Sequence, residues 1–186
     1  MQQSVQPTSP MTVDTFLAWA ETLPRSERYE LVDGTPIRMP AERVRHAVVK
    51  ANVYVALKRA SETLTPQPFA LADGATLKVD GFTAFEPDAA LLATPPRDFD
   101  AITVDDPLVV VEVLSPSTKT YNQTTKLPRY FLIPTVAYVL LIDPSRRTVA
   151  VHSRSDAATV GEGDTVTLDP PGITLATADF FQNVPR

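Results

Sequence analysis

The segment 107–118, PLVVVEVLSPST, constrains this chain most because it places one carboxylate inside an otherwise apolar run. The run is rich in β-branched residues, too short for a helix and bounded by prolines. These features predict a strand buried on both faces at the centre of a sheet. Because side chains alternate along a strand, Glu112 shares a face with Val110 and Leu114, and neither face of the strand is polar.

An ionised Glu112 on an apolar face needs a partner, since burying an unpaired charge costs at least several kcal/mol. A metal ion, a cationic side chain or a raised pKa of the carboxyl group would each offset that cost. The alternative is a strand that ends early, so that Glu112 reaches solvent at the margin of the sheet. The pattern is compatible with both interpretations.

The length of 186 residues predicts one domain with an ordinary core. We expect residues 1–11, which are polar and bear prolines, to form a disordered tail, and residues 12–186 to form the single domain. The absence of cysteine excludes disulfides and thiolate metal sites. No apolar run approaches the ~20 residues that span a bilayer, and no signal peptide is recognisable, so we expect a cytoplasmic protein without membrane partners.

Helices and hairpins alternate in the first half of the chain. We predict a short amphipathic helix over 12–23, a hairpin over 28–39 that turns at Asp33-Gly34, and a long helix over 41–63. A second hairpin is predicted over 69–80, with Asp73-Gly74 at its turn.

The second half of the chain contributes the strongest strands. We predict strands over 85–92, 107–114 and 137–143, a hairpin partner over 147–152, weaker strands over 165–168 and 173–175, and a short terminal helix. A helix is expected within 121–133, its start displaced because Pro128 cannot donate a backbone hydrogen bond. The fold class is therefore α/β (α+β), with a central β-sheet between helices.

Composition and motifs exclude several functions. The net charge of −5 argues against a general nucleic-acid coating protein but permits a local basic patch. The chain contains no phosphate-binding loop, no dinucleotide fingerprint and no serine nucleophile elbow, and its two histidines do not form an H-E-x-x-H motif.

An acidic pair remains as the candidate site. Asp88 follows Pro87 at the start of one strand, and Glu112 lies in the next strong strand, so adjacent strands would bring both carboxylates together. Two hard oxygen ligands and a backbone carbonyl suit Mg²⁺ or Mn²⁺. The alternative for Asp88 is a turn residue, because aspartate is common after proline in turns.

Several motifs together resemble the bacterial Uma family of restriction-endonuclease-like proteins, within the PD-(D/E)XK nuclease superfamily. The resemblance extends over roughly residues 13–151, and its pieces are YELVDG at 29–34, PD at 87–88, EVLSPST at 112–118, Lys126, Tyr130 and the strand 137–143. It implies a mixed central sheet flanked by helices, with Asp88, Glu112 and the Val113 carbonyl as ligands of a divalent metal.

The resemblance also suggests further site residues. The superfamily pattern has a lysine two residues after the glutamate, where this chain has Leu114, and Lys126 is the candidate that takes over. Glu30 matches a family acid that serves as an outer ligand or base, and His46 matches a family histidine suited to a general base or a phosphate contact. The alternatives are a solvated helix lysine, an exposed hairpin glutamate and a surface histidine. Family members usually carry Asp where this chain has Asn122.

Two functions from different classes follow from these residues. The first is a Mg²⁺-dependent (or Mn²⁺-dependent) DNA endonuclease-like phosphodiesterase, in which Lys126 assists water attack. Its contacts to nucleic acid would come from Arg45, Lys50, Lys119 and Arg129. A homodimer is expected if both strands are cut, since this needs two sites. The second is a catalytically silent module on the same fold that binds a protein or nucleic acid.

Overall fold

The computed structural model describes residues 10–24 and 26–186. The predicted tail over 1–11 lies outside the described residues except for its last two. Of these, Met11 is buried, and its backbone N–H donates to the Gly34 carbonyl oxygen at 2.8 Å. Within the described ranges, no helix is both long and apolar enough to cross a membrane.

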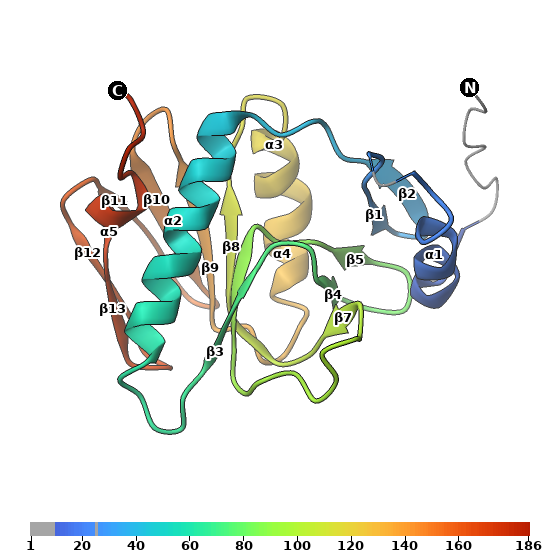
Figure 1. Cartoon of the computed structure of the whole chain (residues 1–186), viewed down its shortest axis with the longest axis horizontal. Coiled ribbons are helices and arrows are strands. Elements are labelled where there is room, and N and C mark those ends of the chain that lie inside the picture. Colours follow the sequence, from blue (N-terminus) through green and yellow to red (C-terminus); the bar gives the residue numbers. More distant parts are fainter. Residues whose placement is uncertain (1–9, 25) are drawn as a thin grey trace.

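A six-stranded sheet forms the centre of the molecule (Figure 1). Its order is β11-β10-β9-β8-β6-β3, and β8 and β9 run parallel while the other neighbours run antiparallel. The mixed sheet of the predicted fold class is therefore confirmed. The strands are β3 (Phe69–Ala72), β6 (Ala89–Leu92), β8 (Pro107–Val113), β9 (Tyr138–Asp143), β10 (Thr148–Ser153) and β11 (Ala157–Gly161).

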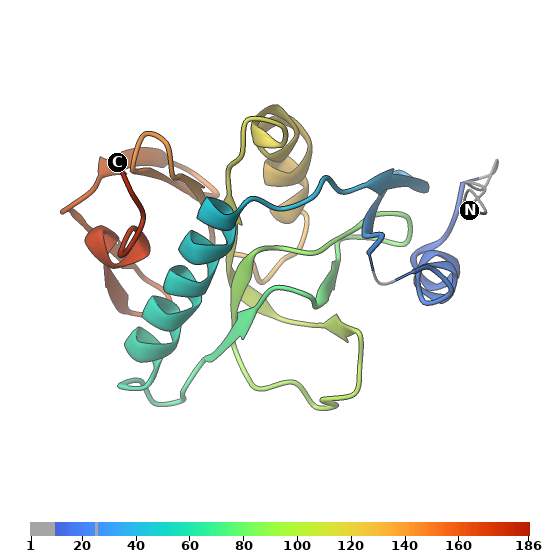
Figure 2. The ribbon, with the colours of Figure 1, turned by 45° about the horizontal axis from the view of Figure 1, so that its top comes forward.

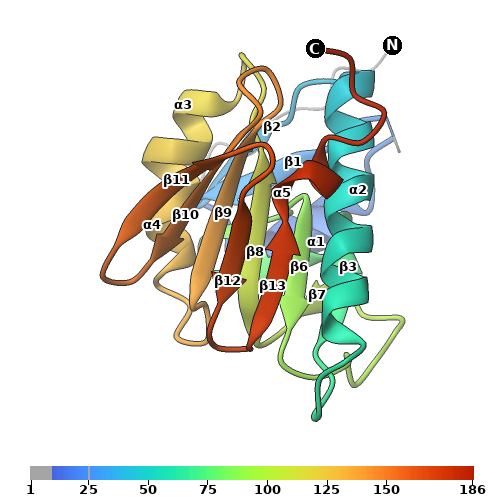
Figure 3. The same cartoon turned by 90° about the vertical axis from the view of Figure 1, so that its left-hand side faces the viewer.

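Each face of this sheet is covered by a different part of the chain (Figure 3). On one face, α2 (Val44–Ser61), the hairpin of β12 (Thr165–Leu168) and β13 (Ile173–Ala176), and α5 (Thr177–Phe180) pack on Val109, Val111 and Val113. On the other face, α3 (Lys119–Tyr121), the π-helix η1 (Asn122–Lys126) and α4 (Leu127–Tyr130) form one helical segment. Tyr130 of this segment packs with Val110 and Leu114. The alternation predicted for the central strand is thus observed.

A smaller sheet of order β2-β1-β5-β4-β7 adjoins the first, and it carries α1 at the end of the molecule remote from β12 and β13 (Figure 2). Asp33 and Gly34 have φ angles of 48° and 78°, which suit the predicted tight hairpin turn between β1 and β2. The elements are α1 (Val13–Ala20), β1 (Tyr29–Val32), β2 (Thr35–Arg38), β4 (Thr76–Lys78), β5 (Ala84–Phe85) and β7 (Thr103–Val104).

The second predicted hairpin, over 69–80, is wrong. Strand β3 pairs with β6 in the large sheet, whereas β4 pairs with β5 and β7 in the small one. The Asp73-Gly74 turn, with Gly74 at φ 102°, redirects the chain from one sheet to the other. Glycine permits this backbone conformation whether or not the flanking strands pair with each other, so the turn residues alone did not determine the partners.

The displaced start predicted for the helix in 121–133 is observed for α4, which begins at Leu127 with Pro128 in its first turn, but helical backbone also precedes it from Lys119. The π-helix immediately before the proline accounts for this difference. The backbone N–H of Leu127 donates to the Asn122 carbonyl five residues earlier, so the helix is wider there than a regular α-helix. Pro128 then occupies the first turn of α4, where a missing N–H costs little.

Candidate active site

A cleft lies at the carboxyl end of β8, where the two sheets meet α2 and the helical segment 119–130. Its free volume of about 90 Å³ is enough for several water molecules or a hydrated cation. The residues predicted from the sequence to be catalytic all line it, together with the predicted carbonyl ligand: Glu30, His46, Asp88, Glu112, Val113 and Lys126. Residues that are far apart in sequence are therefore assembled in one place.

Glu112 is buried, with 3% of its surface exposed, so the alternative in which it reaches solvent is wrong. Lys126 Nζ lies 2.5 Å from its Oε1, the Tyr130 hydroxyl donates to the same oxygen, and Asn122 Nδ2 donates to Oε2 at 3.1 Å. Burial raises the pKa of Glu112 to about 7; Lys126 opposes this shift, while the nearby carboxylates of Asp88 and Glu30 add to it. Burial is thus the main cause of the raised pKa, and Lys126 does not offset it.

Lys126 and Glu30 form the innermost ion pair of the cleft. Each is 1% exposed, and Lys126 Nζ lies 2.8 Å from Glu30 Oε1. Glu30 also accepts hydrogen bonds from the Glu86 backbone N–H at 2.9 Å and the Tyr121 hydroxyl at 3.2 Å. Burial by itself lowers the pKa of Lys126, but Glu112 and Glu30 outweigh it and raise the pKa, so the ammonium stays charged. A solvated lysine and an exposed glutamate are both excluded by this geometry.

The π-helix explains how Lys126 reaches this position. Asn122 and Lys126 stand at its two ends, and both are buried against Glu112. Leu114, where the superfamily usually has lysine, is instead 8% exposed and packs with Tyr130 in the apolar core. The Lys126 ammonium group therefore lies beside Glu112, although the position where the superfamily has its lysine is occupied by the apolar Leu114.

Asp88 precedes β6, and the pairing of β6 with β8 brings it beside Val113. Its Oδ2 accepts a hydrogen bond from the Val113 backbone N–H at 2.7 Å. Burial alone would raise the pKa of Asp88, but the hydrogen bond and charge of His46 outweigh burial and lower it. Asp88 is thus held ionised at the mouth of the same cleft that contains Glu112.

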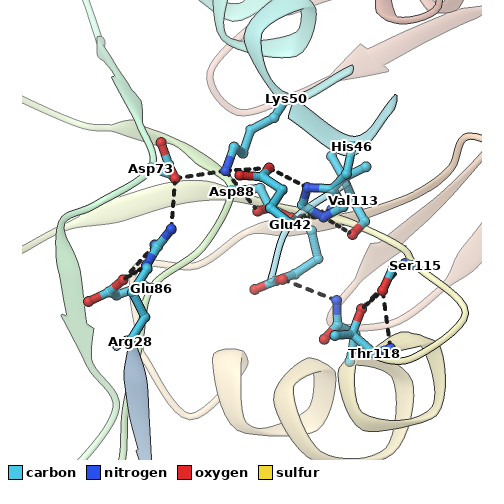
Figure 4. A network of polar contacts seen from close by, with 12 residues as sticks. Arg28, Glu42, His46, Lys50, Asp73, Glu86, Asp88, Val113, Ser115 and Thr118 are labelled. Atoms are coloured by element: carbon cyan, nitrogen blue, oxygen red, sulfur yellow. Dashed lines mark hydrogen bonds and ion pairs between the residues drawn. The ribbon is translucent and has the colours of Figure 1, made fainter. Parts of the chain in front are cut away.

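His46 projects from α2 into the cleft, with 16% of its side chain exposed (Figure 4). Its Nε2 donates to the Val113 carbonyl oxygen at 2.7 Å and lies 3.4 Å from Asp88 Oδ2, while Nδ1 donates to Glu42 Oε1 at 2.6 Å. Burial lowers the pKa of His46, but Asp88 and Glu42 more than compensate and raise it to about 9. The histidine is therefore a cationic part of the cleft wall, not a surface residue.

A chain of ion pairs extends along one rim of the cleft (Figure 4). Lys50 Nζ lies 2.7 Å from both Glu42 and Asp73, and Arg28 bridges Asp73 at 3.4 Å and Glu86 at 2.7 Å. Sequence reasoning missed Arg28, Glu42, Asp73 and Glu86 because they stand in loops, at turns or at strand ends. The one available signal was Asp73-Gly74, which we interpreted as a hairpin turn alone.

The four residues predicted to contact nucleic acid do not form one surface. Lys50 lies inside the cleft, whereas Arg45 and Lys119 line an adjoining hollow with Arg43 and Arg146. Lys119 Nζ pairs there with Asp143 at 3.0 Å. Arg129 is paired with Asp33 of the β1–β2 turn at 2.6 Å and lines neither the cleft nor the hollow.

The donor atoms of the cleft fit a divalent cation. The carboxylates of Asp88 and Glu112 and the Val113 carbonyl are hard oxygen ligands. Among the described residues, the side-chain donor atoms that all lie within 4.8 Å of one another are those of Glu42, His46 and Asp88, and Glu112 is not part of this group. Asn122 also lines the cleft, and its Oδ1 is buried with no hydrogen-bond partner among the described residues.

Comparisons with known proteins agree with the resemblance seen in the sequence. A solved structure of a "putative nuclease belonging to DUF820" from Anabaena variabilis superimposes with a TM-score of 0.74 at 20% identity, covering 92% of this chain and 98% of that one. At this identity the similarity shows the fold, and no curated protein sequence matches. The model of the Uma2 family, described as "Putative restriction endonuclease", matches residues 13–178. This chain therefore belongs to the Uma2 family of restriction-endonuclease-like proteins.

Proposed function

We propose that this chain is a metal-dependent phosphodiesterase that cleaves DNA. The observation that carries the proposal is the convergence of Lys126 on Glu112 at 2.5 Å, inside a cleft that also presents Asp88 and the Val113 carbonyl. A buried lysine beside a carboxylate with a raised pKa is an arrangement found at catalytic sites more often than in ordinary cores. Membership of the Uma2 family supports the same reaction class.

Asp88, Glu112 and the Val113 carbonyl would hold the cation, Mg²⁺ or Mn²⁺. When bound, the ion supplies Lewis acidity and a nucleophilic water at neutral pH. Lys126 keeps its proton because Glu30 and Glu112 hold it from two sides. Its ammonium group is therefore available to orient the attacking water and to offset negative charge as it develops on the phosphate.

The groups around Lys126 limit its movement. Glu30 is itself fixed by the Glu86 backbone and the Tyr121 hydroxyl, and Tyr130 fixes Glu112. Such preorganisation matters because a misplacement of about 1 Å can cost about a hundredfold in rate. The Tyr121 hydroxyl thus positions Glu30, and the Tyr130 hydroxyl positions Glu112. We assign neither hydroxyl a role in proton transfer.

Nucleic acid is the proposed partner although the chain is acidic overall. Arg43 lines both the cleft and the adjoining hollow, and Arg45 and Arg146 extend the positive charge from there. Guanidinium groups at this position suit the phosphates that flank a scissile bond. A homodimer remains part of the proposal because cleavage of both strands requires two sites.

One observation favours a second function, the catalytically silent module. Lys126 already neutralises much of the charge on Glu30 and Glu112, so the fold has an internal counter-ion in place of a metal. A protein that had lost catalysis could retain this cluster as a structural element. The two functions differ in whether a divalent ion binds with stoichiometry near one.

The test is calorimetric titration of Mn²⁺ and Mg²⁺ into the wild-type protein and into Glu112→Gln. We expect stoichiometric binding in the wild type and its loss in the variant. Plasmid nicking with Lys126→Met should then fall by about a hundredfold or more. Lys78→Met is the control that retains cleavage, because Lys78 pairs with Asp14 and lines neither the cleft nor the hollow. Circular dichroism confirms that each variant is folded. Absence of ion binding in the wild type would reject the phosphodiesterase in favour of the silent module.

A further inference from the structure

The adjoining hollow is larger than the cleft and shares part of its wall. Its free volume is about 640 Å³, against about 90 Å³ for the cleft. Pockets that enclose small organic ligands commonly measure about 300–1,000 Å³. Arg43, His46 and Ser115 line both spaces. A ligand that occupies the cleft can therefore continue into the hollow, and the hollow has room for a nucleotide.

The lining of the hollow includes three apolar side chains from the ends of two neighbouring strands. Leu114 and Pro116 follow β8, and Pro144 follows β9. Apolar carbon of this kind gains nothing from a phosphate group, but it gains free energy when the face of a base covers it and excludes water. Leu114 is also the residue that stands where the superfamily pattern has lysine. This lining favours a ligand with an apolar face in addition to its charge.

Positive charge without an ionic partner surrounds these apolar side chains. Arg43, Arg45 and Arg146 line the hollow and are exposed. In the described part of the chain, none of the three takes part in an ion pair, whereas Lys119 of the same hollow pairs with Asp143 at 3.0 Å. Three guanidinium groups are therefore free to bind phosphates of a nucleic acid backbone.

The cations on the other side of the cleft are already paired. Lys50 Nζ lies 2.7 Å from Asp73, and Arg28 pairs with the same carboxylate. Figure 4 shows this group away from Ser115, which lines the hollow. A duplex presents the phosphates of two strands around its bases, whereas sites for single strands combine a cationic groove with surfaces that the bases cover. One-sided charge beside an apolar lining matches the second kind of site.

We propose that the hollow binds an unpaired nucleotide next to the scissile phosphate, so that single-stranded DNA is the preferred substrate. The base lies against Leu114, Pro116 and Pro144, and the arginines around them bind the phosphates on either side of it. The inference rests on the proposed phosphodiesterase and names its substrate class. It also gives Leu114 a role, because an ammonium group at this position would replace part of the apolar surface that the base covers.

The first test needs only the wild-type protein and measures binding without cleavage. Fluorescence anisotropy in EDTA compares a labelled single-stranded oligodeoxynucleotide with the blunt duplex of the same sequence. We expect the single strand to bind about tenfold more tightly or better. An abasic strand of the same length keeps every phosphate but loses every base, and its affinity should fall by about fivefold or more.

The second test places the bound strand on the hollow. Arg45→Gln and Arg146→Gln should each weaken single-strand binding and lower the slope of log affinity against log salt concentration by about 0.7, the value for one phosphate contact. Arg59→Gln is the matched control for Arg45→Gln. It removes an exposed arginine near the other end of α2, which lines neither the cleft nor the hollow.

The outcomes separate this inference from the proposed function. Equal affinity for duplex and single strand, equal affinity for the abasic strand, or variants at Arg45 and Arg146 that behave like Arg59→Gln would each overturn the nucleotide site and leave the metal site standing. Tight binding of the single strand by a protein that binds no divalent ion would reject the phosphodiesterase and support the hollow as a DNA site. If an arginine variant fails to fold, the wild-type comparisons decide.

Discussion

Two acidic residues at the same edge of the central sheet have opposite electrostatic surroundings. Glu112 and Asp143 lie near the carboxyl ends of the parallel neighbours β8 and β9, and they are 3% and 8% exposed. Burial alone would raise the pKa of Asp143, but hydrogen bonds from Ser145, Lys119 and the Arg146 backbone lower it to about 2. Burial raises the pKa of Glu112 to about 7 against the pull of Lys126.

The difference comes first from the deeper burial of the Glu112 carboxyl group, and then from where the hydrogen-bond donors of each acid originate. Asp143 accepts from the Ser145 backbone at 3.0 Å, the Ser145 hydroxyl at 2.6 Å and the Arg146 backbone at 3.1 Å, all within its own turn. Glu112 is instead contacted by Asn122, Lys126 and Tyr130 of the helical segment 119–130. Of these side chains, Lys126 also pairs with Glu30. Asp143 is thus stabilised as a turn residue, whereas Glu112 would gain most from a further cation.

The largest expected effect on this comparison is removal of the buried lysine. Lys126→Met leaves Glu30 and Glu112 without their shared counter-ion, and we expect the free energy of unfolding to fall by about 3–5 kcal/mol. Lys119→Met, which removes the partly exposed partner of Asp143, should cost about 1 kcal/mol or less. Urea unfolding followed by circular dichroism measures both. Equal losses would show that the two acids are held in the same way.

The next effect concerns Asp143 and has a defined pH dependence. Because its folded pKa is depressed, its stabilisation is present above the unfolded pKa of about 4 and is lost as pH falls through about 2. Asp143→Asn should therefore reduce the free energy of unfolding by about 1–2 kcal/mol at pH 7, and by almost nothing near pH 2. A loss that persists at low pH would show that packing, rather than charge, is responsible.

A smaller loss is expected at the turn that serves Asp143. Ser145→Ala removes one hydroxyl donor and should lower the free energy of unfolding by about 1 kcal/mol. The pKa of Asp143, followed by carbon-detected NMR titration, should rise toward its ordinary value while that of Glu112 stays unchanged. A shift at Glu112 would mean that the two acids are coupled.

The smallest expected effect belongs to the residue that matters most for the proposed reaction. The pKa of Glu112 is raised in the folded state. Its contribution to the free energy of unfolding is therefore fully present below about pH 4.5 and is lost as pH rises through about 7. Without metal, the free energy of unfolding of Glu112→Gln at pH 8 should differ from that of wild type by less than about 1 kcal/mol. As pH rises from 5 to 8, the variant should become more stable relative to wild type. Thermal unfolding across that range checks the sign, and a growing deficit of the variant would contradict it.

Local patterns were sufficient to predict the frame of the fold. The apolar run around Glu112, its two faces and the Asp33-Gly34 hairpin depend on periodicity and turn chemistry within a few residues. The acids Asp88 and Glu112 were also found in this way, because each stands out against an apolar strand. What these patterns leave undetermined is the partner of a short strand, as with β3 and β4.

The rest of the site depends on contacts between distant segments. Lys126 has the sequence environment of a solvent-facing helix lysine, and its burial follows from the π-helix and from Glu30 on another sheet. Glu42 gains its position only when α2 places His46 and Lys50 around it. Neither residue carries a local signal, so family resemblance indicated Lys126 and nothing indicated Glu42.

The separation along the chain between Glu30 and Lys126 also bears on how the protein folds. The pair closes a loop of 96 residues, and the loop contains all of α2, the β3–β6 pairing and β8. Closing so long a loop costs entropy, and burying the charges of Glu30, Glu112 and Lys126 costs their hydration. Both costs oppose folding until the two sheets have docked. We expect this ion pair to form after the folding transition state, so that weakening it accelerates unfolding and leaves the folding rate almost unchanged. The candidate site would then be the last part of the molecule to assemble and the first to open.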